Sequence, residues 1–436
     1  MPRFIRGVIF FTFIFLFSIS AVGVLFYAGG YRYHWEKHII EKTGQFVFET
    51  KPKGATVTLS GKQYRTPTHI PYLLSGEYWV EVAKDGYHSW KERLTIIPGR
   101  STIVSDLVLL KNEPSRELFR EKSIQHLTIG DNERIFFIVK DTLMYYDTRS
   151  HDHGILYQAE EPILSFQLSP SGKRFFIHMQ KKSVFLEERS AGIKTFDLTF
   201  FKQPIQKSGW THTNQFILGT NKGIYRIDYP QKHAELVYAY PYSDFFTADK
   251  LYIIAGTLEK KLFVLDPQNA ESLYDVGALP RDSFSFEETH ESFLAIRNTR
   301  GGTYLFDRSD LRKGYIAIEG VSNFSWGREN SFIAWNDFEV WRYTIKGSEV
   351  KKELLTRQSE PIRDGIFHED ISQMFFISGK GDVTALETRE GRERNRVSLE
   401  RFSTLQTLIM GSDKKTLYGV GDKNGTSGIF AISFIE

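Results

Sequence analysis

Three short clusters of polar residues have side chains that could support chemistry. His151-Asp152-His153 places two imidazoles and a carboxylate within three positions, and these are side chains that bind zinc. Asp422-Lys423-Asn424-Gly425 begins like a calcium loop but lacks the oxygen ligands and the distal glutamate that such a loop needs. His368-Glu369-Asp370 could pair an acid with a base. No cluster has a second group of ligands or catalytic residues nearby in sequence, so we expect turns, no metal and no cofactor.

The rest of the sequence is equally poor in reaction motifs. It contains no glycine-rich phosphate loop and no Gly-x-Ser-x-Gly nucleophile motif. It contains no cysteine, which excludes disulfides, thiolate zinc sites and cysteine nucleophiles. The net charge of +3 is too small to indicate a nucleic acid partner. We therefore expect a non-catalytic protein.

Basic residues follow a more regular pattern. One or two cations stand between the second and third strand-like segments of every repeat but one, where Asn336-Asp337 takes their place. The cations are Lys140, Lys181, Lys182, Lys222, Lys260, Lys261, Arg300, Lys380 and Lys423. On one face of a ring they would form a basic rim that attracts a polyanion, such as a teichoic-acid-like wall polymer or anionic headgroups. Glutamates in the segments that link the repeats, such as Glu160 and Glu400, would partly neutralise it, so a merely solvated face is the other interpretation.

The repeats that carry these cations predict the fold. From residue 124 onward, four strand-like segments recur about every 40 residues, a period typical of propeller blades. The second segment of each repeat is an apolar run, as in Phe216-Ile217-Leu218. The last repeat has only three strands, and we expect Glu117–Glu121 to supply the fourth and close the ring. The chain is thus predicted to be all-β with an eight-bladed β-propeller, or seven blades if a weak unit near Phe245 is fused.

The layout of the blades resembles that of TolB-like and WD-repeat propellers. No Trp-Asp dipeptide recurs, and no other propeller signature is present. The resemblance therefore implies an architecture and no particular activity.

Residues 46–110 form a separate unit of short strands and tight turns. An ordered series of turn and strand residues carries a resemblance to the PEGA domain, a small all-β module of bacterial surface proteins: Pro52, Gly54-Ala55-Thr56-Val57, Gly61-Lys62, Thr66-Pro67, Gly76-Glu77-Tyr78 and Gly86-Tyr87. Tyr64-Arg65 departs from the pattern, because the family usually has a glycine before Thr-Pro. The resemblance implies a β-sandwich that acts as a spacer or binding module without enzymatic activity.

The N-terminus predicts a membrane anchor. Arg3 and Arg6 precede an uncharged apolar run over residues 7–28, long enough to cross a bilayer. The arginines should remain cytoplasmic and leave the bulk of the chain outside. A cleaved signal peptide is the alternative, since Ser18-Ile19-Ser20 offers a cleavage site, but the apolar run continues past it.

Together these patterns predict a single-pass, extracytoplasmic binding or scaffold protein of the bacterial cell envelope. Its partners would be the membrane, through residues 7–28, and a cell-wall polymer or another envelope protein. The alternative is a propeller hydrolase or lyase that acts on cell-wall glycans. The expected order is a cytoplasmic tail (1–6), a transmembrane anchor (7–28), a juxtamembrane linker (29–45), a PEGA-like β-sandwich (46–110) and a β-propeller (111–436) closed by strand 117–121.

Overall fold

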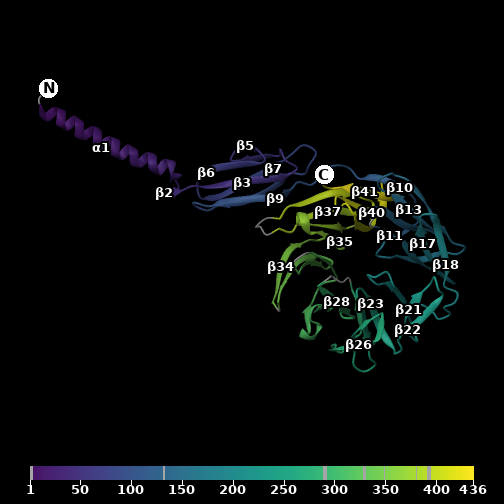
Figure 1. The fold of residues 1–436 in the computed structure, drawn as a ribbon. Helices are drawn as coiled ribbons and strands as arrows, with labels where there is room; N and C mark the ends of the chain where they lie inside the picture. Colours follow the sequence, from purple (N-terminus) through teal and green to yellow (C-terminus); the bar gives the residue numbers. More distant parts are fainter. Residues whose placement is uncertain are drawn as a thin grey trace. The chain divides into compact units, whose positions relative to one another are not determined.

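The structure, a computed structural model, describes residues 3–130, 133–287, 292–327, 330–347, 349–379, 381–389 and 394–436. The chain forms two compact units (Figure 1). The first comprises Met1–Glu113, Arg389–Val397 and Phe434–Glu436, and the second comprises Pro114–Thr388 and Ser398–Ser433.

Helix α1 (Arg3–Ala28) is the long helix of the first unit. Its segment Ile5–Ala28 is apolar enough to cross a membrane, and no part of its most apolar window is buried by the chain. At 1.5 Å per residue these 24 residues extend over about 36 Å, more than the hydrocarbon core of a bilayer. A signal sequence near the N-terminus has the same properties.

Where the sequence suggested only a linker, the structure has a hairpin. Strands β1 (Tyr31–His34) and β2 (Ile39–Lys42) pair antiparallel, with Tyr31 opposite Lys42. Thr43 ties the end of this hairpin back to its start, because its hydroxyl donates to the carbonyl of Gly30 at 2.7 Å. Each strand has only four residues, which is too short for its alternation to be recognised in the sequence.

Two sheets then form a β-sandwich. One contains β6 (Thr68–Leu73), β3 (Gly44–Lys51) and β9 (Ser101–Val108), and the other β5 (Lys62–Arg65), β4 (Thr56–Leu59), β7 (Gly76–Ala83) and β8 (Trp90–Ile96). Phe46 and Phe48 of the first sheet pack in one buried core with Val57, Val80 and Val82 of the second. The alternating apolar residues of β3 and β7 therefore face each other across the sandwich.

The described residues of the second unit form eight four-stranded antiparallel sheets. The first three sheets are β11 (Ile124–Ile129), β12 (Arg134–Val139), β13 (Thr142–Asp147) and β14 (His153–Gln158); β15 (Ile163–Leu168), β16 (Arg174–Met179), β17 (Ser183–Arg189) and β18 (Gly192–Asp197); and β19 (Lys207–Trp210), β20 (Phe216–Thr220), β21 (Gly223–Asp228) and β22 (His233–Tyr238). The next three are β23 (Tyr242–Thr247), β24 (Leu251–Ala255), β25 (Lys261–Asp266) and β26 (Asn269–Ala278); β27 (Phe284–Phe286), β28 (Phe293–Asn298), β29 (Thr303–Asp307) and β30 (Tyr315–Ile318); and β31 (Asn323–Trp326), β32 (Ser331–Trp335), β33 (Glu339–Lys346) and β34 (Glu349–Arg357). The last two are β35 (Ile362–His368), β36 (Gln373–Ser378), β37 (Asp382–Glu387) and β38 (Arg396–Arg401); and β39 (Thr404–Met410), β40 (Thr416–Lys423), β41 (Thr426–Ser433) and β10 (Arg116–Arg120). Short 3-10 turns follow β29 (η1, Leu311–Lys313) and β35 (η2, Glu369–Ile371).

The apolar second strands of these sheets are buried on both faces. As a result, the core clusters lie between sheets: Phe136 of the first sheet packs on Phe175 of the second, with ring centroids 5.0 Å apart. Phe176 of the second packs on Phe216 of the third at 4.5 Å. Sheets that share their faces in this way form a propeller-like fold. The all-β, propeller-like architecture with an N-terminal apolar helix agrees with the sequence prediction.

The final sheet combines strands from the two ends of the unit. β10 pairs antiparallel with β41, with Arg116 opposite Ala431 and Arg120 opposite Gly428 (Figure 1). A further core cluster joins Ile124 and Phe137 of the first sheet to Ile429 of the last. Neighbouring inner strands also lie beside one another across this junction, where β11 contacts β39.

Candidate functional site

The basic residues singled out in the sequence occupy equivalent positions in the second unit. Each described one lies at the turn between the second and third strands of its sheet, or at the strand end beside it. In an antiparallel sheet this turn is at the same end as the link to the neighbouring sheet. Lys380 lies outside the described residues.

Four of these cations have carboxylate partners. Lys182 lies 3.2 Å from Glu160, Lys261 2.9 Å from Asp275 and Arg300 3.5 Å from Asp282, measured between the closest nitrogen and oxygen atoms. Lys423 is the most enclosed of the four: its Nζ lies 2.5 Å from Glu400 and donates to the Ser115 hydroxyl at 2.8 Å.

The Lys423–Glu400 pair has a structural role. Glu400 also accepts the backbone N–H of Ser115 at 2.6 Å, just before β10. Burial by itself raises the pKa of Glu400, but the hydrogen bonds from Lys423 and Ser115 outweigh it and hold that pKa below its usual value. Lys423 therefore anchors the start of the closing strand, and we assign it no part in a ligand site.

The remaining four cations make no ion pair with a described residue. Lys140, Lys181 and Lys222 are exposed. Lys260 is half-buried, and its Nζ donates to the Ser243 hydroxyl at 2.6 Å and to the Gly256 carbonyl at 2.8 Å. The structure therefore divides the expected rim into a neutralised part and a part that keeps its charge.

The linking segments supply the acid for two of the paired cations, Glu160 for Lys182 and Asp282 for Arg300. The other two acids, Asp275 and Glu400, belong to the fourth strands β26 and β38. In the second sheet, the Glu161 carboxylate accepts the backbone N–H groups of Lys181 and Lys182, both at 3.2 Å. At the third sheet the corresponding residue is neutral: Gln203 accepts from the Thr220 hydroxyl at 3.0 Å. This linking segment, residues 198–206, contains Lys202 and no acidic residue, although Asp197 just before it interacts with Lys182.

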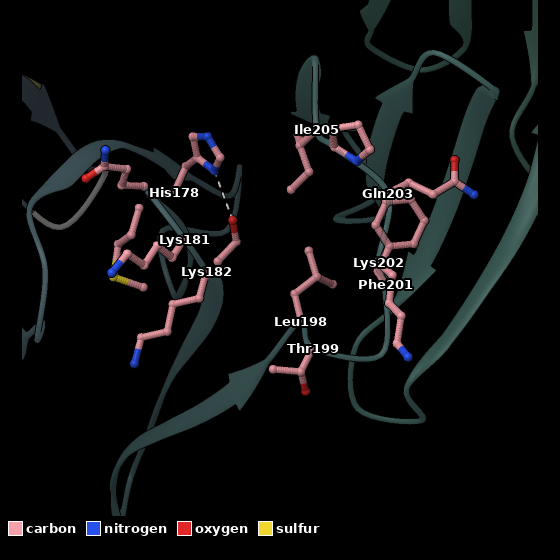
Figure 2. A pocket seen from close by; sticks show the side chains of 13 residues that line it. His178, Lys181, Lys182, Leu198, Thr199, Phe201, Lys202, Gln203 and Ile205 are labelled. Atoms are coloured by element: carbon pink, nitrogen blue, oxygen red, sulfur yellow. Dashed lines mark hydrogen bonds between the residues drawn. The ribbon is translucent and has the colours of Figure 1, made fainter.

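A hollow of about 640 Å³ opens at this place. In Figure 2, His178, Lys181 and Lys182 come from the second sheet, and Phe201, Lys202 and Gln203 come from the linking segment on the facing side. The residues that line it include three lysines and no carboxylate; Leu198, Phe201, Pro204 and Ile205 supply apolar surface. We call this feature the lysine hollow.

The walls of the lysine hollow are held by specific contacts. The His178 ring lies stacked on Phe176, and its Nδ1 is 2.9 Å from the Ser183 hydroxyl. Burial lowers the pKa of His178, so this ring is neutral at physiological pH and the lysines supply the charge. On the facing wall, the Gln203 amide donates to the Tyr225 hydroxyl at 2.9 Å.

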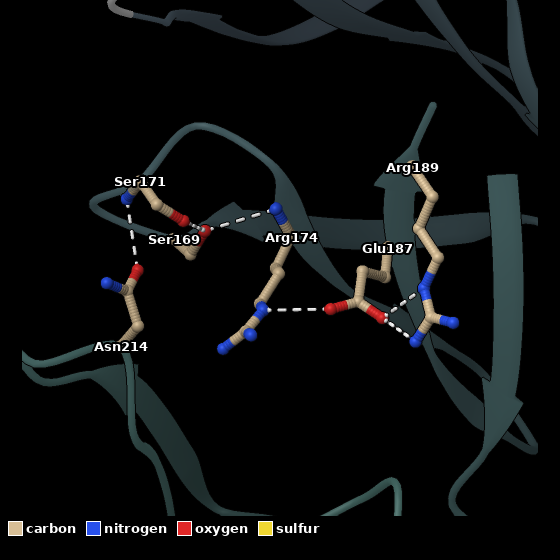
Figure 3. Close-up of polar contacts among 6 residues, drawn as sticks. All are labelled: Ser169, Ser171, Arg174, Glu187, Arg189 and Asn214. Carbon is tan, nitrogen blue, oxygen red and sulfur yellow. Dashed lines mark hydrogen bonds and ion pairs between the residues drawn. The ribbon is translucent and has the colours of Figure 1, made fainter. Parts of the chain in front are cut away.

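At the opposite ends of the strands, the second and third sheets are joined directly. The side-chain carbonyl of Asn214 accepts the backbone N–H of Ser171 at 3.0 Å (Figure 3). Within the second sheet, the Ser169 hydroxyl accepts the backbone N–H of Arg174 at 3.1 Å. Glu187 lies between Arg174 and Arg189. Burial raises the pKa of Glu187, but its hydrogen bonds and charge interactions with the two arginines outweigh that effect and lower it overall. The Asn214–Ser171 contact and the aromatic core between the sheets fix the spacing of the two walls, while the other contacts order the second sheet itself.

The three clusters with chemically capable side chains occupy different surroundings. The His151 ring nitrogen lies 3.3 Å from the Tyr146 hydroxyl, in a turn where His151 has a φ of 62°. His368 is buried and its Nε2 lies 2.8 Å from the Lys414 carbonyl. Asp422 accepts from the Gly425 N–H and the Ser427 hydroxyl across a hairpin turn. Within the described ranges, no group of three or more His, Asp and Glu residues lies close enough to hold a metal ion.

Sequence reasoning missed Phe201 and Lys202 as site residues, because it compared only the turns between second and third strands. The sequence did hold a signal: the link through residues 198–206 carries a lysine and no acid, whereas the other links considered contain glutamates.

Comparisons with known proteins support the two folded units. Residues 43–109 match the family model of the PEGA domain. The structure is similar to the C-terminal WD40 domain of Sif2, with a TM-score of 0.52 and 11% identity over 73% of this chain and 98% of that one. Sqt1 from Saccharomyces cerevisiae is similar with a TM-score of 0.49 and 12% identity over 74% and 99% of the two chains. No curated protein matches the sequence. The chain therefore combines a PEGA domain with a WD40-like β-propeller fold and one apolar N-terminal helix.

Proposed function

We propose that this chain is a membrane-anchored binding or scaffold protein of the bacterial cell envelope. In this proposal α1 remains in the membrane, the PEGA domain acts as a spacer, and the eight four-stranded sheets form one ring of eight blades that is displayed outside the cell.

The observation that carries the proposal is the exposure of α1. Its apolar window is not buried by any part of the chain, although it includes side chains as large as Phe11 and Phe17. Exposing such a surface to water is unfavourable by about 25 cal/mol per Å² of apolar area, so the helix requires a membrane or removal. Arg3 and Arg6 on its N-terminal side favour a cytoplasmic N-terminus.

Two further observations favour binding over catalysis. The PEGA match accounts for the unit that follows the helix, and WD40-like propellers usually mediate binding or scaffolding. The polar clusters with catalytic residue types are held in turns or in contacts with neighbouring backbone, and none of them faces the lysine hollow.

The proposal is tested by the topology of the full-length protein. Protease added to intact spheroplasts should digest the chain beyond about residue 30 and leave only the helix protected. A second measurement, the mass of the mature N-terminus, should show an intact α1. Protection of the propeller would contradict the proposed display, and a mature chain that begins at Ala21 would replace the anchor by a signal peptide.

A further inference from the structure

We infer that the lysine hollow binds a linear polymer of polyol or sugar units joined by phosphodiesters. The inference rests on the proposed binding function and specifies the site and the chemistry of the ligand.

Charge is the first argument. Lys181 and Lys202 line the hollow on two different walls and have no ion pair with a described residue. Lys182 adds a third ammonium group that is shared with Glu160 at 3.2 Å. Because Glu161 is occupied by the backbone of the 181–182 turn, it does not reach across to neutralise the other lysines by hydrogen bonding. The hollow therefore has an ammonium group on each side for an anion, with the carboxylates of Glu160, Glu161 and Asp197 near Lys182.

The cations of the hollow are compatible with phosphate. Lysine binds phosphate as a point charge, whereas the arginine guanidinium binds carboxylates and phosphates alike through two parallel hydrogen bonds. No arginine lines the hollow. The ammonium groups belong to long, exposed side chains, which suits successive charges along a chain better than one enclosed phosphate.

The volume and the apolar lining of the lysine hollow indicate the second component of the ligand, its polyol or sugar units. A volume of about 640 Å³ exceeds that of a single phosphate group and lies within the usual range of ligand pockets. Leu198 and Ile205 lie between the two walls, and Phe201 lies on the wall of Lys202 (Figure 2). Phe201 is held edge-on by Tyr225 with ring centroids 5.2 Å apart, so it presents a fixed apolar surface. Carbon-rich polyol or sugar units fit against this surface while the flanking phosphates meet the lysines.

The test uses full-length protein in a neutral detergent and a purified glycerol phosphate polymer as the probe. The double variant Lys181→Ser/Lys202→Ser should bind it at least tenfold more weakly than the natural chain. The control Lys173→Ser/Lys232→Ser removes the same charge from exposed turns at the opposite ends of the strands. It should bind within twofold of the natural chain, and equal weakening in both variants would overturn the assignment to the hollow.

Salt and competing probes separate specific recognition from general attraction. The slope of log K against log salt should become shallower by about 0.7 for each lysine removed, as for contacts to a single-stranded polyanion. Polygalacturonate, a carboxylate polymer, should bind at least tenfold more weakly, and equal binding would overturn the phosphate assignment. Glycerophosphoglycerol, the soluble headgroup of an anionic lipid, should also bind more weakly. If it binds as tightly as the polymer, the ligand is a headgroup and the polymer assignment is wrong.

A separate measurement tests the apolar surface that Phe201 contributes to the lysine hollow. Phe201→Ala should weaken binding of the glycerol phosphate polymer several-fold and leave binding of inorganic polyphosphate, which has no carbon, unchanged. An equal loss for both probes would show that the variant perturbs the hollow as a whole and would contradict a specific role for Phe201. If the natural chain pulls down envelope components and the lysine variant does so equally well, the hollow is the wrong site while the proposed function stands.

Discussion

Gly428 allows a direct test of how the propeller is closed. It lies in β41 opposite Arg120 of β10. A Cβ at position 428 would lie 2.1 Å from the Phe119 carbonyl oxygen, whereas ordinary contacts begin at 3.4 Å. Because the obstacle is backbone, Gly428→Ala must push the two strands apart by about 1.3 Å at this point.

The size of the effect follows from the bonds that are lost. A separation of this size breaks about two ladder hydrogen bonds, each with a net contribution of about 1 kcal/mol. Some packing is lost as well, because Phe119 contacts Phe137 of the first sheet with ring centroids 5.0 Å apart. We therefore expect a loss of about 2–3 kcal/mol, which lowers the thermal midpoint of a unit of this size by about 3–5 °C.

The assay is thermal unfolding of the full-length protein in neutral detergent, followed by circular dichroism. Gly302→Ala is the matched control, since its Cβ would meet only the Asn298 side chain, at 3.3 Å. Hydrogen exchange of residues 116–121 provides an independent readout and should become faster in Gly428→Ala alone. If the two variants have the same midpoint and the same exchange in this segment, β10 does not stabilise the ring as we have argued.

Three further substitutions test two contacts described above and Asp364 of β35, whose carboxylate accepts the backbone N–H groups of Gly365 and Leu408. Glu400→Gln should cost about 3 kcal/mol at neutral pH, because it leaves the enclosed Lys423 without its carboxylate. Because the pKa of Glu400 is lower in the folded than in the unfolded protein, this stabilisation is complete above the unfolded-state pKa. It disappears as pH falls through the folded-state pKa, so the unfolding midpoints of the variant and the natural chain should converge in acid. For Asp364 the effect is opposite, because burial raises its pKa. The natural chain therefore loses stability as pH rises from about 4 through the raised pKa. The stability of Asp364→Asn relative to the natural chain should accordingly increase from about pH 4 to about pH 7. Asn214→Gly keeps the left-handed backbone (φ 60°) but removes the acceptor for Ser171, and denaturant unfolding should show a loss of about 1 kcal/mol.

Much of the fold could be predicted because its elements repeat. Apolar runs such as Phe216-Ile217-Leu218 mark second strands that are buried on both faces, and the structure places β20 there. Helix α1 was equally visible as a long uncharged run. The hairpin of β1 and β2 was not, because each strand has four residues and the pairing depends on contacts such as that of Thr43 with Gly30.

The candidate site was only partly predictable. The sequence shows which positions carry a cation but not which acid reaches it, because the acids come from linking segments and from fourth strands alike. Lys182 and Lys181 are adjacent and chemically identical, yet only the first forms an ion pair in the described structure. Lys202 became a site residue only because the segment after β18 folds back toward the turn of the second sheet.

The pairing of β10 with β41 also has a consequence for biosynthesis. Strand β10 is made before every other strand of its unit, and its partner β41 is made last. During synthesis β10 therefore exposes unpaired backbone groups, and the face of the first sheet that Ile429 will cover remains open. Exposed edges and apolar faces of this kind promote aggregation. A chain that stalls before β41 therefore exposes backbone and apolar groups at its first sheet as well as at its incomplete end. Chaperones and proteases can recognise such an unfinished ring by its earliest strands.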